Sequence, residues 1–362
     1  MFDFKPSVLI FFLSFVIIRK TSFKEETMSY LPSEKRYEKM CYLPAGASGL
    51  KMSALSLGLW HNFGVEDDFS NMKKMIFTAF DNGITCFDLA NTYGRPLFGS
   101  AETNFGKILK DNLSAFRDQL VISTKAGYAM WDGPYGNGGG RKYLLSSLDQ
   151  SLKRLGVDYV DIFYHHRPDP ETPFEETALA LAAAVNSGKA LYVGLSNYDG
   201  EGLAKASKIL DELHVPFIVN QNRYSILDRT VEKNGLIDAA RESGKGVIAF
   251  SPLAQGLLAG RYSNGIPSDS RVRTNGFSLK ESAITDEKLS AVRGLAAIAS
   301  ERGETLSQTA LAWVLSRETV CGVIIGASSP AQILENVKAA NYAPFSAEEL
   351  AAIDEITKNA TI

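Results

Sequence analysis

Residues 160–196 read VDIFYHHRPDPETPFEETALALAAAVNSGKALYVGLS, and this stretch contains the pattern that decides the fold. It begins and ends with short runs rich in β-branched and aromatic residues, at 160–166 and 190–196, which predict buried strands. Between them, residues 174–185 have the apolar spacing of an amphipathic helix. A strand, a helix and a second strand in succession indicate a parallel sheet covered by helices.

The same unit recurs along the chain. Strands are predicted at residues 54–60, 84–90, 120–126, 160–166, 190–196, 217–221, 246–252 and 321–327. Helices are predicted at residues 69–82, 100–110, 142–155, 174–185, 201–213, 231–242, 306–315 and 330–340. Eight such units predict the α/β class and a single (β/α)8 TIM barrel. A doubly wound open sheet fits less well, because no G-x-G-x-x-G sequence follows the first strand.

The composition excludes several classes of partner. The chain has 362 residues, of which 45% are apolar and 22% charged, and its net charge is −3. Without a basic excess, we expect neither nucleic acid nor an anionic membrane as a partner. The three cysteines, Cys41, Cys86 and Cys321, are too few and too scattered for a disulfide framework or a metal site. We therefore expect reduced thiols, no bound metal and a cytoplasmic protein.

The N-terminus differs from the rest of the chain. Residues 8–18 read VLIFFLSFVII, which is short for a membrane span of about 20 residues. The run resembles the apolar region of a signal peptide, but no small-x-small cleavage site follows it. A start assigned too early, before Met28, is the favoured alternative. We therefore predict an extension over residues 1–41, with the barrel domain over residues 42–362.

Ionisable residues follow three consecutive predicted strands. Asp88 ends the second strand and Tyr93 lies in the loop after it, Lys125 ends the third, and His165 and His166 end the fourth. Because the active site of a barrel lies at the carboxyl ends of its strands, these residues are expected to meet at one rim. Such a cluster suggests catalysis, although Asp88 and Lys125 alone are equally consistent with a buried ion pair.

Longer segments resemble the aldo-keto reductase superfamily over most of the chain, from about Tyr42 to Thr357. The similar segments are FDLANTYGRPLFGSAETNFG, ISTKAG, DIFYHHRPDP, GKALYVGLSN, FSPLAQGLLAGRY and IIGASSPAQILENV, and they occur in the order typical of the family. The resemblance implies a homo-oligomer, a tetramer or larger. It also implies NADPH-dependent reduction of a small aldehyde or ketone, such as L-glyceraldehyde 3-phosphate or methylglyoxal, to the alcohol.

The catalytic tetrad of the superfamily corresponds to Asp88, Tyr93, Lys125 and His166. Hydride delivery leaves negative charge on the carbonyl oxygen, so a general acid must supply a proton, and this role falls to Tyr93. We expect the Lys125 ammonium to lower the pKa of Tyr93, with Asp88 holding Lys125 in place. Of the two histidines, His166 matches the family's H-x-P motif, because it lies two residues before Pro168. The resemblance implies that His166 orients the carbonyl. His165 is expected to be a packing residue.

The resemblance also assigns the cofactor site. It places Trp60, Tyr93 and His166 in the wall of the substrate pocket, and it places Trp60 and Asp88 also in contact with the cofactor. The nicotinamide contacts are Ser196, Asn197, Gln221 and Phe250, at the ends of the fifth, sixth and seventh predicted strands. The pyrophosphate contacts are Ser251, Leu253, Gln255 and Gly256. The adenosine contacts are Arg261, Arg271, Gly326, Ser328, Gln332, Glu335 and Asn336, of which Arg261 and Arg271 belong to the longest predicted loop, residues 256–285.

Two other functions fit less well. A metal-dependent hydrolase needs clustered histidine and carboxylate ligands, but the chain has four histidines and no H-x-H after its first strand. A non-catalytic NADPH-binding regulatory subunit, like the potassium channel β-subunits of the same superfamily, is the main alternative. Those subunits have Asn at the position that His166 occupies here, so the complete tetrad favours the enzyme.

Deletion of residues 1–27 tests the predicted extension. The shortened protein should fold and retain full reductase activity, because the deletion removes no predicted strand and no tetrad residue. The measurement compares aldehyde-dependent NADPH oxidation and the thermal midpoint of the two proteins. Aggregation or loss of activity after the deletion would show that the segment belongs to the folded domain.

Overall fold

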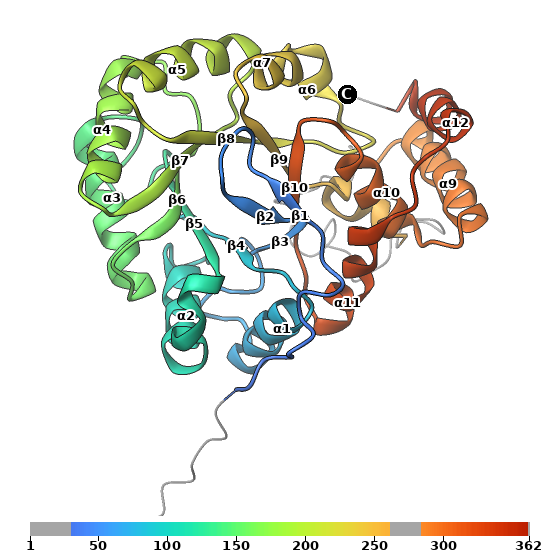
Figure 1. Cartoon of the computed structure of the whole chain (residues 1–362), viewed down its shortest axis with the longest axis horizontal. Helices are drawn as coiled ribbons and strands as arrows, with labels where there is room; N and C mark the ends of the chain where they lie inside the picture. The colour runs from blue at the N-terminus through green and yellow to red at the C-terminus, as the bar shows by residue number, and fades with distance from the viewer. Residues whose placement is uncertain (1–29, 261–283, 361–362) are drawn as a thin grey trace, which may run out of the picture. The chain divides into compact units, whose positions relative to one another are not determined.

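The computed structural model of the protein describes residues 30–260 and 284–360. Within them, eight parallel strands close into a barrel in the order β10, β3, β4, β5, β6, β7, β8, β9 (Figure 1). This confirms the predicted (β/α)8 fold and all eight predicted strands. Their bounds are β3 (Leu55–Gly58), β4 (Cys86–Asp88), β5 (Val121–Ala126), β6 (Val160–His165), β7 (Ala190–Ser196), β8 (Phe217–Arg223), β9 (Gly246–Phe250) and β10 (Val320–Ile325).

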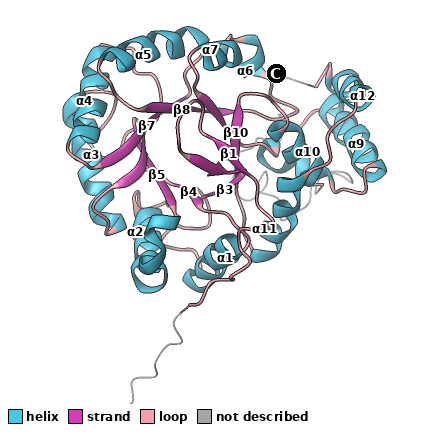
Figure 2. Cartoon of the chain, viewed as in Figure 1, coloured by secondary structure: helices cyan, strands magenta, loops and turns pink. Residues whose placement is uncertain are grey.

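Helices surround the barrel (Figure 2). Those that correspond to predicted helices are α1 (Phe69–Asp81), α2 (Ser100–Ile108), α3 (Arg141–Leu155), α4 (Phe174–Asn186), α5 (Gly200–Glu212), α10 (Leu306–Leu315) and α11 (Pro330–Val337). The helix predicted over residues 231–242 is divided into α6 (Thr230–Lys233) and α7 (Leu236–Glu242). Gly235 between them has a φ of 78°, which lies outside the helical region and ends the first segment.

Two α-helices and two strands of the described chain were not predicted. Helices α9 (Asp286–Glu301) and α12 (Ala347–Thr357) pack against each other beside the ring. Strands β1 (Tyr42–Pro44) and β2 (Lys51–Ser53) form an antiparallel hairpin. The hairpin contributes Leu43, Leu50 and Met52 to the apolar cluster inside the barrel, so it closes the end opposite to the carboxyl ends of the strands.

Residues before the hairpin also contact the barrel domain. The backbone N–H of Ser33 donates to Asp81 of α1 at 2.8 Å, and the carbonyl of Lys39 accepts from Asn341. These contacts lie within the compact unit that begins at Pro32. The predicted boundary between an extension over residues 1–41 and a barrel domain over residues 42–362 remains a prediction. Over the described residues, no helix is both long enough and apolar enough to cross a bilayer.

The barrel interior is tightly filled below the carboxyl ends of the strands. Every residue of β5, β6 and β10 is buried. Gly194 of β7 leaves room for the ring of Tyr164, because a Cβ at residue 194 would lie 2.3 Å from that ring. Polar groups can therefore enter the interior only where hydrogen-bond partners meet them, as they do around Asp88.

Candidate active site

A large cavity opens at the carboxyl ends of the barrel strands. Its volume is about 1240 Å³, which exceeds the roughly 300–1,000 Å³ of most small-molecule pockets. The predicted site residues that line it are Trp60, Asp88, Tyr93, His166, Ser196, Asn197, Gln221, Phe250, Ser251, Leu253, Gln255, Gly256, Gly326, Ser328, Gln332, Glu335 and Asn336. Lys125 lies beneath the floor, and the predicted contacts Arg261 and Arg271 lie outside the described residues.

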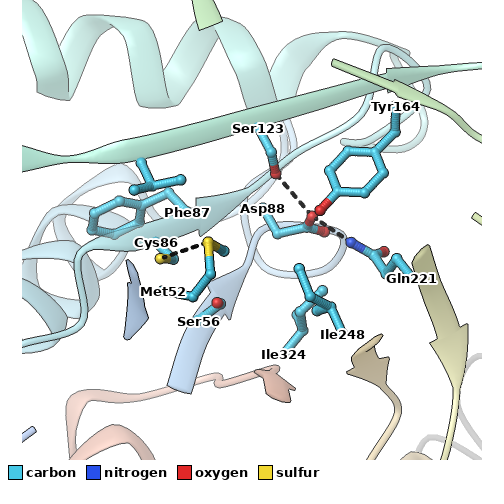
Figure 3. Close-up of a pocket in the computed structure, with 11 residues that line it drawn as sticks. Met52, Ser56, Cys86, Phe87, Asp88, Ser123, Tyr164, Gln221, Ile248 and Ile324 are labelled. Carbon is cyan, nitrogen blue, oxygen red and sulfur yellow. Dashed lines mark hydrogen bonds between the residues drawn. The ribbon is translucent and has the colours of Figure 1, made fainter. Parts of the chain in front are cut away.

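Asp88 lies at the floor of the cavity and forms an ion pair with Lys125 beneath it. The ammonium of Lys125, which is completely buried, donates to the carboxylate of Asp88 at 2.5 Å. The other carboxylate oxygen of Asp88 accepts from Ser123 at 3.0 Å and from Gln221 at 2.9 Å. Figure 3 shows Asp88 between these two side chains, with Tyr164 beside them. The buried carboxylate is therefore matched both in charge and in hydrogen bonds, as its burial requires.

Tyr93 lies directly above this pair. Lys125 donates to the hydroxyl of Tyr93 at 3.3 Å and to the carbonyl of Leu89 at 2.8 Å. With the bond to Asp88, these contacts occupy all three N–H groups of the ammonium. The loop that carries Tyr93 is held in turn, because the carbonyl of Tyr93 accepts from the backbone of Gly99 at 3.0 Å. Strand, ion pair and loop together fix the position of the phenol.

The acidity of Tyr93 differs from the prediction. Burial raises the pKa of Tyr93 well above its usual value, and the nearby negative charge of Asp88 raises it further. We expected the ammonium of Lys125 to lower this pKa, but the net shift is upward. Burial of the phenol and the negative charge of Asp88 outweigh the ammonium, which lies 3.3 Å from the hydroxyl.

His166 lies beside Tyr93. The two rings are 6.1 Å apart and meet edge to face, and the ring of Tyr128 packs against His166 at 4.7 Å. Burial lowers the pKa of His166 well below its usual value, and the charge of Lys125 lowers it further, so the ring is neutral at pH 7. Its Nδ1 atom is buried and has no hydrogen-bond partner in the described part of the chain.

His165 is turned away from the cavity. Its Nδ1 atom lies 2.7 Å from the hydroxyl of Tyr198, and its side chain is buried. Burial lowers the pKa of His165 to about 4, which keeps this ring neutral as well. The structure thus places the two neighbouring histidines differently: His166 faces the reaction space, and His165 packs behind it.

The predicted nicotinamide contacts are already joined by hydrogen bonds. The Ser196 hydroxyl donates to the carbonyl of Gln221 at 2.9 Å. Asn197, at a positive φ of 63°, donates to the carbonyl of His166 at 2.9 Å. Trp60 also lines the cavity, and its ring lies 6.3 Å from the ring of Tyr93. Ser196 and Asn197 are held in place by contacts within the protein.

Strained backbone follows β9. Ser251 and Gln255 have φ values of 53° and 57°, which side chains other than glycine rarely adopt, and Gly256 follows at 103°. Such turns aim successive backbone N–H groups outward, which is a common way to bind an anion. The predicted pyrophosphate contacts therefore form a compact turn at the cavity wall.

The start of α11 forms the far end of the cavity. The side-chain oxygen of Gln332 accepts from the backbone N–H of Ser328 at 2.7 Å and from the Ser328 hydroxyl at 3.2 Å. The backbone of Glu335 accepts from Gln308 at 3.1 Å. The positive end of the helix dipole favours an anion at this end.

Sequence reasoning missed several lining residues. The cavity is also lined by His61, Asn62, Arg95, Tyr128 and Arg223. Tyr128 follows Lys125 by three residues, and Arg95 follows Tyr93 by two, so proximity to the tetrad was an available signal for both. Nothing in the sequence pattern distinguished Arg223. Over residues 30–260 and 284–360, no group of three His, Cys, Asp or Glu side chains is arranged to hold a metal ion.

Comparisons with known proteins agree with this geometry. Residues 54–358 match the model of the Aldo/keto reductase family. The chain is 53% identical over 331 residues to L-glyceraldehyde 3-phosphate reductase of Escherichia coli O157:H7, covering 91% of this chain and 95% of that protein. It is 39% identical over 311 residues to a protein of Arabidopsis thaliana named as a probable voltage-gated potassium channel subunit beta, covering 84% and 93% of the two chains.

A solved structure is also similar. The crystal structure of a thermostable aldo-keto reductase in complex with the inhibitor epalrestat superposes with a TM-score of 0.69 and 32% identity. The superposition covers 88% of this chain and all of that one. The family match over residues 54–358 includes all eight barrel strands and every described residue that lines the cavity.

Asp88→Asn should destabilise the protein strongly. The substitution leaves the buried Lys125 ammonium without its anion, a change that typically costs about 3–5 kcal/mol. Asp149→Asn is the matched control, because Asp149 forms a 2.7 Å pair with Lys189 in which both side chains are about half exposed. The control should change stability by less than about 1 kcal/mol. Urea unfolding at pH 7 measures both, and equal losses in the two variants would contradict the account of the floor.

Proposed function

Because the chain belongs to the aldo/keto reductase family, we propose that it reduces a small aldehyde or ketone, such as L-glyceraldehyde 3-phosphate or methylglyoxal, to the alcohol with NADPH. The observation that carries the proposal is the 3.3 Å contact between Lys125 and Tyr93 at the floor of the cavity. The contact holds the hydroxyl of Tyr93, a proton donor, next to the cavity in which a carbonyl group can bind.

The direction of the hydrogen bonds assigns the donor. An ammonium can only donate, so the hydroxyl oxygen of Tyr93 accepts from Lys125. The O–H of Tyr93 is then available to donate into the cavity. Because its pKa is raised, the phenol keeps its proton at neutral pH until a carbonyl oxygen gains negative charge. Lys125 then stabilises the phenolate that the transfer leaves behind.

His166 has a different task. As a neutral imidazole it retains one N–H, which it can donate to the same carbonyl oxygen. Two donors, Tyr93 and His166, thereby fix the oxygen and leave the carbonyl carbon facing the rest of the cavity. Tyr128 packs edge to face on the imidazole and limits its rotation.

The other lining residues fit a nicotinamide dinucleotide. Ser196, Asn197 and Gln221 offer amide and hydroxyl groups suited to a carboxamide, next to the aromatic face of Phe250. The turn after β9 and the start of α11 both suit phosphate groups. A bound NADPH would supply the hydride, and the protein would supply position and the proton.

Tyr93→Phe tests the general acid. Turnover of an aldehyde should fall by about a hundredfold or more, since the variant loses the donated proton. NADPH binding, followed by fluorescence titration, should persist because only one hydroxyl is removed. Tyr37→Phe is the control, since Tyr37 is exposed and its hydroxyl contacts Gln119.

Near-normal turnover in Tyr93→Phe would remove this residue from the mechanism. A wild-type protein that binds NADPH but reduces no aldehyde would instead match a non-catalytic regulatory subunit.

Arg261→Ala tests the preference for NADPH over NADH, which rests on the family resemblance. If Arg261 pairs with the 2′-phosphate, its loss should raise the Michaelis constant for NADPH by about tenfold or more and leave that for NADH nearly unchanged. Turnover at saturating NADPH should change little, because the contact is remote from the transferred hydride. Equal use of both cofactors by the wild type, or equal harm to both in the variant, would contradict the assignment.

A further inference from the structure

A second buried ion pair lies behind the site, between α2 and α3. The carboxylate of Glu102, in the first turn of α2, is completely buried. One of its oxygens accepts from the Nε atom of Arg154 at 2.7 Å, and the other accepts from the hydroxyl of Thr124 at 2.5 Å. A buried carboxylate is costly unless its charge and its hydrogen bonds are both matched, and here both are.

The pair is attached to the strand that carries Lys125. Thr124 and Lys125 are consecutive residues of β5, and both are completely buried. Consecutive side chains of a strand point to opposite faces of the sheet, so Thr124 meets Glu102 on the helix side while Lys125 meets Asp88 inside the barrel. Glu102 therefore holds the backbone next to Lys125 from the helix side, as Asp88 holds the ammonium from inside.

The same pair also contacts the turn that holds Tyr93. The backbone N–H groups of Gly99 and Ala101, at the start of α2, donate to the carbonyl of Tyr93 at 3.0 and 3.5 Å. Gly99 has a φ of 83°, and a Cβ at this position would lie 2.7 Å from the Nε atom of Arg154. The side chain of Arg154 therefore lies against the backbone of Gly99. A displacement of the ion pair would also displace the donors that hold Tyr93.

The charge of Glu102 acts on Lys125. Burial lowers the pKa of Lys125, while the negative charge of Asp88 and, less strongly, that of Glu102 raise it. The other titratable groups that surround this ammonium are Tyr93, Tyr164 and His166. The two carboxylates, on opposite faces of β5, therefore both favour the charged form of Lys125.

We propose that Glu102 and Arg154 are positioning residues, whose ion pair fixes α2 against β5 and thereby holds the phenol of Tyr93 at the ammonium of Lys125. This inference rests on the proposed reductase function and adds two residues on which that function depends. Neither residue lines the described cavity, so both act through Lys125 and Tyr93. Their loss should alter turnover and its pH dependence, and it should leave cofactor binding nearly unchanged.

Glu102→Gln removes the charge and keeps the size of the side chain. In the full-length protein with NADPH and methylglyoxal, kcat should fall by about tenfold or more, because a small displacement of Tyr93 misaligns proton donation. The alkaline limb of the kcat profile should move to lower pH, because Lys125 loses its proton more readily without the nearby negative charge. The dissociation constant for NADPH, measured by fluorescence titration, should change by less than about twofold.

Asp161→Asn is the matched control. Asp161 forms another buried ion pair, with Arg117 at 2.9 Å, and it also binds β5, where it accepts from the backbone N–H of Ile122 at 2.8 Å. Ile122 lies near the end of β5 that is remote from Lys125. The control should lose stability, because it leaves a charged partner behind, but it should keep the wild-type kcat and alkaline limb.

Variants of Thr124 test the same contact if Glu102→Gln does not fold. Thr124→Val removes the hydroxyl that donates to Glu102 and keeps the shape of the side chain, whereas Thr124→Ser retains the hydroxyl. The value of kcat should fall in Thr124→Val and be largely restored in Thr124→Ser. Equal values in the two variants would contradict the proposal.

An unchanged kcat and alkaline limb in Glu102→Gln would overturn the proposal. Equal effects on kcat in Glu102→Gln and Asp161→Asn would also overturn it, since the pair would then serve stability alone. If the wild type reduces no aldehyde, the proposed reductase function fails, and amide hydrogen exchange still tests the positioning. The amides of Gly99 and Ala101 should exchange about tenfold or more faster in Glu102→Gln than in Asp161→Asn. Equal exchange rates in the two variants would refute it.

Discussion

The 2.5 Å contact between Asp88 and Lys125 is the interaction on which the site depends. A buried ammonium is costly unless an anion and further acceptors surround it. Here burial lowers the pKa of Lys125, and Asp88 opposes that effect. Asp88 is held in turn by Ser123 and Gln221, as Figure 3 shows. The position of Tyr93 therefore depends on the alignment of three strands, because Asp88 belongs to β4, Ser123 and Lys125 to β5, and Gln221 to β8.

The barrel makes this meeting possible. Its strands are parallel, so their last residues gather at one end, and the hairpin of β1 and β2 closes the other. Below the ion pair the interior is filled by apolar side chains and the ring of Tyr164. Above it the loops diverge and leave the cavity. Asp88 lies at the boundary between the filled barrel interior and the open cavity. A side chain at this level is shielded from solvent on the interior side and can contact a ligand on the cavity side.

Much of this arrangement was predictable from the sequence, for reasons that differ between elements. The strands were recognisable because burial on both faces requires continuous apolar runs. The ionisable residues at the ends of three strands were visible in the same pattern, but their assignment as a tetrad came from the family resemblance. Gly235, which interrupts a helical pattern, and the short β1–β2 hairpin were missed, since local propensity does not reveal a break or a pairing of three residues. The raised pKa of Tyr93 depends on how completely the phenol is buried and on the nearby carboxylate, which only the packed structure shows.

The central claim is that Tyr93 rests as a protonated phenol above the neutralised ion pair. Its most direct test is the ¹³Cζ resonance of Tyr93 in tyrosine-labelled protein, assigned by its absence in Tyr93→Phe and followed as the pH rises. The account predicts that the resonance stays at the phenol position up to and beyond pH 10.0, where an ordinary tyrosine is half ionised. A transition to phenolate below about pH 9 would contradict it, because Lys125 would then outweigh burial and Asp88.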